Sequence, residues 1–224
     1  MNSSIIIVYG NPGSGKGTQA QRIADHFSFE HFNTGGVIEK IVNDPTKQDD
    51  PIIQRERKLF DEGILCTPEW VTEIVKNAIV SLRSQNKGII FSGSPRTLYE
   101  AKELMPLVDK LYGRENIFVL EIAIRSETAI FRNSHRRVCE QCGQPLVYTS
   151  ENEKLEACPT CGGKLVTRTL DDPEVINVRL KEYQERTAPI FDYLAEQGFI
   201  IKKIDGEPMP DEVTKNILNF LSTK

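Results

Sequence analysis

Residues 10–18, Gly-Asn-Pro-Gly-Ser-Gly-Lys-Gly-Thr, have the types and spacing to bind a phosphate group. An apolar β-branched run, residues 5–8, precedes them, and a helix-like segment begins at Gln19. A strand that turns through glycines into a helix points backbone N–H groups and the positive end of the helix dipole at one place. Lys16 adds a full charge there, so the pattern G-x-x-x-x-G-K predicts an anion site. The alternative is a glycine-rich turn that binds nothing, and the flanking strand and helix argue against it.

Four cysteines form a second candidate site. Two C-x-x-C-G turns, at Cys139 and Cys142 and at Cys158 and Cys161, have fifteen residues between the inner cysteines. This spacing is typical of zinc sites, and four thiolates would complete a tetrahedral, structural site. The alternatives are disulfides or four cysteines that serve as ordinary small apolar residues. Paired turns of this kind disfavour both alternatives if the protein is cytoplasmic, as we expect below, because thiols stay reduced there. Cys66 stands alone and by itself is most simply a buried apolar residue.

Arginines at the ends of predicted elements are a third feature. Phosphoryl transfer needs positive charge around the transferred group and exclusion of water, rather than covalent chemistry from the protein. A single arginine is more often a solvated surface group, but several at element junctions around one insertion favour a shared anion site. The residues are Arg96, Arg132, Arg136, Arg168 and Arg179.

Alternating apolar runs and helical segments must position these residues. Such alternation predicts a parallel, doubly wound α/β sheet with right-handed crossovers. The expected strands are residues 5–8, 29–32, 88–92, 116–122 and 199–204. The expected helices are one from about 19, several short ones within 37–83 with one starting at Thr67-Pro68, one ending at about Met105, one after Ser126 and one over 211–221. Residues 138–167, which hold the paired cysteines, interrupt this alternation.

Charge and composition exclude several classes of protein. The formal net charge of −4 argues against a protein that coats nucleic acid. No stretch approaches the roughly twenty apolar residues of a membrane span, and the first residues lead into the first strand without a secretory signal. We therefore expect a cytoplasmic, monomeric protein without a nucleic-acid or membrane partner.

Several motifs together resemble the adenylate kinase family, in its long form with a zinc-bearing lid. They occur in the family's order over nearly the whole chain, and the G-K-G-T ending of the first one favours small nucleotide kinases over GTPases and motor ATPases. The motifs are G-x-P-G-S-G-K-G-T-Q at 10–19, G-x-P-R-T at 93–97, R-R-V-C at 136–139, R-L-x-E-Y at 179–183 and T-A-P at 187–189.

The resemblance implies an α/β P-loop kinase fold. Its parts are a five-stranded parallel sheet flanked by helices, a helical insertion that binds a nucleoside monophosphate (NMP), and a small zinc-binding lid. The implied boundaries are core at 1–33, 81–136 and 170–224, NMP-binding insertion at 34–80 and lid at 137–169.

The resemblance also implies a phosphotransferase that moves the ATP γ-phosphoryl group reversibly to AMP, with magnesium and without a covalent intermediate. The implied ATP-side residues are Gly13, Ser14, Gly15, Lys16, Gly17, Thr18, Arg132 and Arg136. The implied NMP-side residues are Thr34, Glu39, Cys66, Gly93, Arg96, Glu100, Arg168 and Arg179. The implied catalytic residues are Lys16, Arg96, Arg132, Arg136, Arg168 and Arg179, and Asp171 would orient Arg168 and Arg179.

Three positions depart from the family's pattern. Glu39 replaces an arginine that binds the monophosphate, and a carboxylate there would repel phosphate unless it turns to solvent. Ser92 replaces an aspartate near magnesium, although its hydroxyl can still bond a metal-bound water. Glu100 replaces the glutamine that reads adenine. An ionised carboxylate only accepts hydrogen bonds, which suits GMP, yet a backbone N–H could serve adenine N1 while Glu100 accepts from N6. AMP is our first candidate for the acceptor, and another nucleoside monophosphate, GMP foremost, is the second. If Glu100 is instead a solvated residue, the protein would recognise the base only weakly.

Two further interpretations stay open. Glu39 and Ser92 are also compatible with a nucleotide-binding protein that has weak or no turnover. The basic cluster at 135–137 next to the paired cysteines is compatible with RNA binding, against which the acidic net charge and the lack of interleaved aromatic residues weigh.

Overall fold

The fold is a five-stranded parallel sheet flanked by helices, which confirms the predicted α/β class. The computed structural model of the protein describes residues 4–222. The strands lie in the order β2-β3-β1-β4-β8, and every neighbouring pair is parallel. Their bounds are β1 Ile5–Tyr9, β2 Glu30–Phe32, β3 Ile89–Phe91, β4 Ile117–Ala123 and β8 Ile201–Asp205. All five predicted strands are confirmed, with ends that differ by one or two residues.

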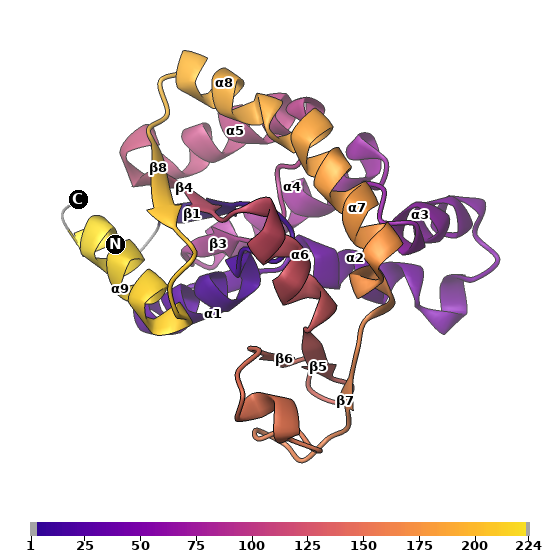
Figure 1. Cartoon of the computed structure of the whole chain (residues 1–224). Coiled ribbons are helices and arrows are strands. Elements are labelled where there is room, and N and C mark those ends of the chain that lie inside the picture. Colours follow the sequence, from indigo (N-terminus) through magenta and orange to yellow (C-terminus); the bar gives the residue numbers. More distant parts are fainter. Residues whose placement is uncertain (1–3, 223–224) are drawn as a thin grey trace.

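Helices cover both faces of this sheet, because alternate strand side chains point to opposite faces. Ile5 and Ile7 of β1 pack with α4, α5 and α8, whereas Ile6 and Val8 pack with α1 and α9. Figure 1 shows α5 and α8 above the sheet and α1 and α9 below it. The bounds of these helices are α1 Lys16–Phe27, α4 Pro68–Ser84, α5 Leu98–Tyr112, α8 Pro189–Glu196 and α9 Pro210–Ser222. A strand buried on both faces needs apolar residues throughout, as β1 has.

The parallel arrangement brings the predicted functional segments to one edge. The phosphate loop follows β1, the G-x-P-R-T motif follows β3, and further loops follow β4 and β8. Carboxyl ends of parallel strands meet at the same edge, which is where open α/β sheets bind ligands.

Short helices connect β2 to β3, as predicted. They are α2 Thr34–Val42, the 3₁₀ turn η1 Pro45–Lys47, α3 Pro51–Asp61 and α4. Asn33 caps α2, since its Oδ1 accepts from the Gly36 N–H at 3.2 Å. Helix α4 begins where Thr67 and Pro68 predict, but the Thr67 hydroxyl donates to buried Glu56 rather than capping the helix.

A small three-stranded antiparallel sheet interrupts the main fold between α6 (Ser126–Ser134) and the short turn η4 (Thr169–Asp171). Its strands are β5 Arg137–Cys139, β6 Pro145–Leu146 and β7 Leu165–Val166, with a 3₁₀ turn η3 at Asn152–Lys154. In Figure 1 this segment projects away from the main sheet. Among the described residues, the two apolar clusters include none from this segment.

One helix is longer than predicted. Helix α5 was expected to end near Met105, but it continues through Pro106 to Tyr112. Proline removes one backbone donor, and burial of Val108 and Tyr112 in the core offsets that loss. Two further segments complete the fold. Helix α7, Pro173–Glu182, passes through a π-helical turn at Tyr183–Thr187 into α8. A 3₁₀ turn, η2 Arg114–Asn116, precedes β4.

Within residues 4–222, no helix has the length and apolar character to cross a membrane.

Candidate active site

The phosphate loop is closed on one side and open on the other. Gly10 and Gly13 have φ of 145° and 86°, and a Cβ on them would lie 2.4 Å from the Ile122 carbonyl and 2.5 Å from Asn133 Nδ2. Gly15 also has a positive φ, of 89°, but a Cβ on Gly15 or Gly17 would meet nothing within 4 Å. An anion can therefore approach the loop from the side of Gly15 and Gly17.

Lys16 begins α1 and turns back over this loop. Its Nζ donates to the carbonyl groups of Gly10 at 2.7 Å and Asn11 at 2.8 Å. Burial lowers the pKa of Lys16 well below its usual value, and the positive charges of Arg96 and Arg179 lower it further. A bound phosphate would oppose each of these effects. Of the other loop residues, Ser14 is buried with no partner for its Oγ, and Thr18 is half-buried.

Asp171 holds two of the arginines. Its carboxylate accepts both Nε (2.8 Å) and a terminal nitrogen of Arg136, and it lies 3.6 Å from Arg179. Arg179 also donates to the Leu170 carbonyl at 2.9 Å. Burial, with Arg136 and Arg96 nearby, lowers the pKa of Arg179 to about 9. Asp171 thus lies beside Arg179, as expected, but its hydrogen-bonded partner is Arg136 rather than Arg168.

Arg168 has a different partner. Its terminal nitrogen donates to Glu39 Oε2 at 3.1 Å. The Glu39 side chain, which was expected to repel phosphate or to turn to solvent, is 44% exposed and forms this ion pair.

A cleft beside the loop brings several predicted residues together. It contains about 480 Å³ of empty space, partly open to solvent, which is in the range of small-molecule sites. Its lining includes Lys16, Gly93, Arg96 and Arg179 from the predicted set. It also includes Tyr9 and Tyr183, which the sequence did not single out. The Tyr9 hydroxyl is buried without a partner, so it is an additional polar group for a ligand.

Three predicted acceptor-side residues differ in whether they line this cleft: Arg96 does, whereas Thr34 and Cys66 are not among the lining residues. Burial lowers the pKa of Arg96, so an anion would stabilise its charge. A Cβ on Gly93 would lie 3.4 Å from both the Arg96 and the Thr34 side chains, and Thr34 Oγ1 is buried without a partner. Cys66 is buried. Its thiol donates to the Glu56 carbonyl at 3.6 Å, and burial raises its pKa to about 12.

Glu100 lies under the G-x-P-R-T turn and is 2% exposed, so the interpretation as a solvated residue is wrong. Oε2 accepts from the Arg96 N–H at 3.0 Å and from Ser94 Oγ at 3.4 Å, and Oε1 accepts from Thr97 Oγ1 at 3.0 Å. Burial raises the pKa of Glu100, which these donors partly oppose. The carboxylate therefore fixes the turn that carries Arg96.

Arg132 is held by the loop after β8. Its guanidinium donates to the carbonyl groups of Gly206 at 2.8 Å and Glu207 at 2.9 Å. The Glu207 carboxylate accepts from the Arg125 N–H at 2.7 Å and Thr128 Oγ1 at 2.9 Å, which ties this loop to the start of α6. Glu207 was not predicted, because no local pattern links it to α6.

Ser92 at the end of β3 belongs to a hydrogen-bond chain that the sequence did not reveal. His31 Nδ1 lies 3.0 Å from Gln21 Oε1, and His31 Nε2 lies 2.6 Å from Ser92 Oγ. Gln21 Oε1 can only accept, so Nδ1 carries the proton and the neutral ring accepts from the serine hydroxyl. Ser92 Oγ then keeps its lone pairs for another donor, such as a metal-bound water.

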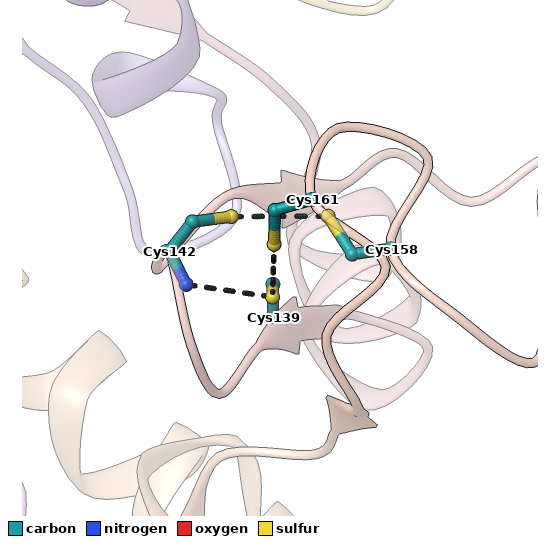
Figure 2. A group of neighbouring side chains, drawn as sticks. All are labelled: Cys139, Cys142, Cys158 and Cys161. Carbon is teal, nitrogen blue, oxygen red and sulfur yellow. Dashed lines mark hydrogen bonds between the residues drawn. The ribbon is translucent and has the colours of Figure 1, made fainter.

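The four paired cysteines form one cluster (Figure 2). All four Sγ atoms lie within 4.8 Å of one another; Cys139 is 3.4 Å from Cys161, and Cys142 is 3.8 Å from Cys158. All five cysteines of the chain lie within the described residues and carry free thiols, so the disulfide alternative is wrong. The Thr160 N–H is the main cause that lowers the pKa of Cys158 to about 6. Four thiols that converge in this way could hold one metal ion.

Aromatic rings do gather at the basic cluster, contrary to the sequence pattern. The Phe131 ring lies 4.3 Å from that of His135 and 5.4 Å from that of Tyr148, between centroids. However, Arg136 is paired with Asp171, and Arg137 donates to backbone carbonyls of its own segment. The guanidinium groups are therefore engaged within the chain, which disfavours RNA binding.

Comparison with known proteins gives one family. The family model described as adenylate kinase matches residues 8–199. An adenylate kinase of Caldicellulosiruptor saccharolyticus is 32% identical over 98% of this chain and 99% of its own length. Adenylate kinases of Petrotoga mobilis and Staphylococcus epidermidis are 34% and 35% identical; each alignment covers 96% of this chain, and 96% and 98% of the respective relative.

The half-buried His31 predicts a loss of stability in weak acid. Burial lowers its pKa, so between the folded-state value and about 6.5 the unfolded chain binds more protons. Stability should fall as pH drops below about 6.5, by about 1.4 kcal/mol per unit of difference between the two pKa values. Urea unfolding at several pH values should show a weaker fall in His31→Gln. His26→Gln, which changes an exposed histidine of α1, is the control, and equal pH dependence of His31→Gln and the unaltered chain would contradict the prediction.

Proposed function

The chain belongs to the adenylate kinase family, and from that premise we propose that it transfers the γ-phosphoryl group of ATP reversibly to AMP, giving two ADP. The observation that carries the proposal is the set of half-buried cations around the phosphate loop. Lys16, Arg96 and Arg179 line one cleft, and each has a pKa lowered by burial, so each would gain from a bound anion.

Each group would act on charge rather than through a covalent bond. Lys16 and the open side of the loop would bind the ATP phosphates, and Arg96 would bind the acceptor phosphate. Arg136 and Arg179, fixed in advance by Asp171, would stabilise the charge that develops on the transferred group without reorganising during the reaction. No covalent intermediate is required.

Magnesium would accompany ATP and neutralise part of its charge. Thr18 in the first turn of α1 and Ser92 at the end of β3 would hold its hydration shell, since both hydroxyl groups can accept from a bound water. The hydrogen bond to His31 supports this role for Ser92, because it leaves the serine lone pairs available.

The chain would divide its work among three parts. We assign core to 1–33, 81–136 and 170–224, NMP binding to 34–80, and a lid to 137–169, which would close over ATP and exclude water. The topology supports this division, since the three-stranded sheet leaves and re-enters the main fold within that range. We also propose that the enzyme acts in the cytoplasm as a monomer, without a nucleic-acid or membrane partner.

Glu100 bears on which nucleoside monophosphate accepts the phosphoryl group. AMP is the acceptor by family membership, whereas an ionised carboxylate that only accepts would suit the donors of GMP. Three donors from its own chain already contact Glu100. These contacts occupy most of the acceptor capacity of the carboxylate, which disfavours GMP and supports AMP as the acceptor.

One assay tests the activity. The protein with ATP and magnesium should form nucleoside diphosphate with AMP and much less with GMP, CMP or UMP, as measured by chromatography. Lys16→Met should reduce the rate at least about a hundredfold, because it removes a charge on the transferring phosphates. If no acceptor gives product, the protein is a nucleotide-binding protein without turnover and the proposal fails. If GMP gives more product than AMP, the acceptor is GMP rather than AMP.

Glu100→Gln tests whether this residue reads the base. An amide both donates and accepts, so the ratio of kcat/KM for AMP to that for GMP should rise about tenfold, the effect of one added hydrogen bond. The same chromatographic assay measures it. An unchanged ratio would show that Glu100 only supports the turn before α5.

We propose that the lid holds one structural zinc ion at Cys139, Cys142, Cys158 and Cys161. Cys139→Ser should lower the zinc content from about one per chain to near zero and lower the melting temperature of the lid, since four ligands close the site. Metal analysis by mass spectrometry measures the first effect and calorimetry the second. Cys66→Ser is the control and should keep its zinc. A metal-free chain of undiminished stability would refute the site.

A further inference from the structure

Glu39 is an acidic residue among the cations of the proposed acceptor site. It lies on α2, on the NMP-binding side, and Arg168 lies between β7 and η4, where the chain leaves the lid. Figure 1 shows α2 near the connection that runs from β7 to α7. The 3.1 Å contact therefore joins α2 to the segment that follows β7.

Arg168 belongs to the same cationic cluster as the residues that line the cleft. Its charge lowers the pKa of Arg179, a cleft residue, together with Arg136 and Arg96. A phosphate attracted by this cluster would thus also attract Arg168.

The two carboxylates that face the cluster are not equivalent. The Asp171 side chain is fully buried and binds Arg136 through both oxygens. The side chains of Glu39 and Arg168 are 44% and 27% exposed, and one hydrogen bond joins them. Water can replace either partner of the exposed pair at little cost in free energy. Loss of the Asp171 contacts would instead leave a buried carboxylate without its cationic partners, which costs much more.

We propose that Glu39 is a positioning residue that competes with the acceptor phosphate for Arg168. Without acceptor, its carboxylate holds Arg168 against α2. When a nucleoside monophosphate binds, Arg168 exchanges this carboxylate for phosphate oxygens, and the released carboxylate faces a dianion. Both effects weaken acceptor binding, so Glu39 sets a lower acceptor affinity than a neutral residue would. The inference rests on the proposed function, since it takes the acceptor to be a nucleoside monophosphate.

The test compares Glu39→Gln with the unaltered, metal-loaded full chain. Calorimetric titration with AMP in the absence of ATP should give a Kd about threefold to tenfold lower for Glu39→Gln, from loss of the exposed pair and of the repulsion. KM for AMP should fall similarly, while KM for ATP and kcat stay within about twofold. A purely structural role for Glu39 would not improve AMP binding.

A matched control removes the same charge elsewhere. Glu73 on α4 is 70% exposed, lies 3.7 Å from Lys76 and is not among the residues that line the cleft. Glu73→Gln should leave the Kd for AMP unchanged; an equal gain in both variants would mean an effect of net charge and would overturn the proposal.

The remaining outcomes are also decisive. Unchanged or weaker AMP binding by Glu39→Gln would overturn the inference, since the pair would then not compete with the acceptor. If the unaltered chain neither binds AMP nor forms product, the proposed function fails instead. Thermal unfolding of each variant confirms that the comparison is between folded proteins.

Discussion

The ion pair between Arg136 and Asp171 is the interaction on which the candidate site depends. Arg136 lies where the chain enters the three-stranded segment and Asp171 where it has just left it, so the pair closes the neck of that segment. The same buried carboxylate approaches Arg179. Guanidinium groups held close together repel, and removing the buried carboxylate that they share would leave that repulsion unopposed. One residue thus fixes both the base of the segment and two of the cations.

The sequence predicted the features that short segments determine. The phosphate loop, the five strands and the two cysteine turns are each encoded within about ten residues, and the structure has all of them. It did not predict contacts between distant residues, such as Glu39 with Arg168 or His31 with Ser92. A pattern along the chain does not say which of several arginines a carboxylate will contact. Asp171 was therefore matched with Arg168, whereas the fold brings Arg136 to it.

The three departures from the family's residue pattern all acquire partners within the chain. Ser92 bonds to His31, Glu39 pairs with Arg168, and Glu100 accepts from the turn that carries Arg96. A polar group at a partly buried site costs free energy unless it is hydrogen-bonded, so each substitution is tolerated only with a local compensation. These contacts differ in how easily water can replace them. The contacts of Glu100 are buried, whereas the ion pair of Glu39 is exposed to water.

The neck also limits how the proposed lid can move. Among the described residues, the segment contributes nothing to the two apolar clusters, so its internal order depends on the cysteine cluster and on its attachment to the core. That attachment consists of the residues near 136 and 168–171, which carry Arg136, Arg168 and Asp171. Because Asp171 also lies 3.6 Å from Arg179, which lines the cleft, a change in the angle of the proposed lid would change a contact of that arginine. Movement of the proposed lid would therefore be linked to the position of one of the positive charges in the cleft.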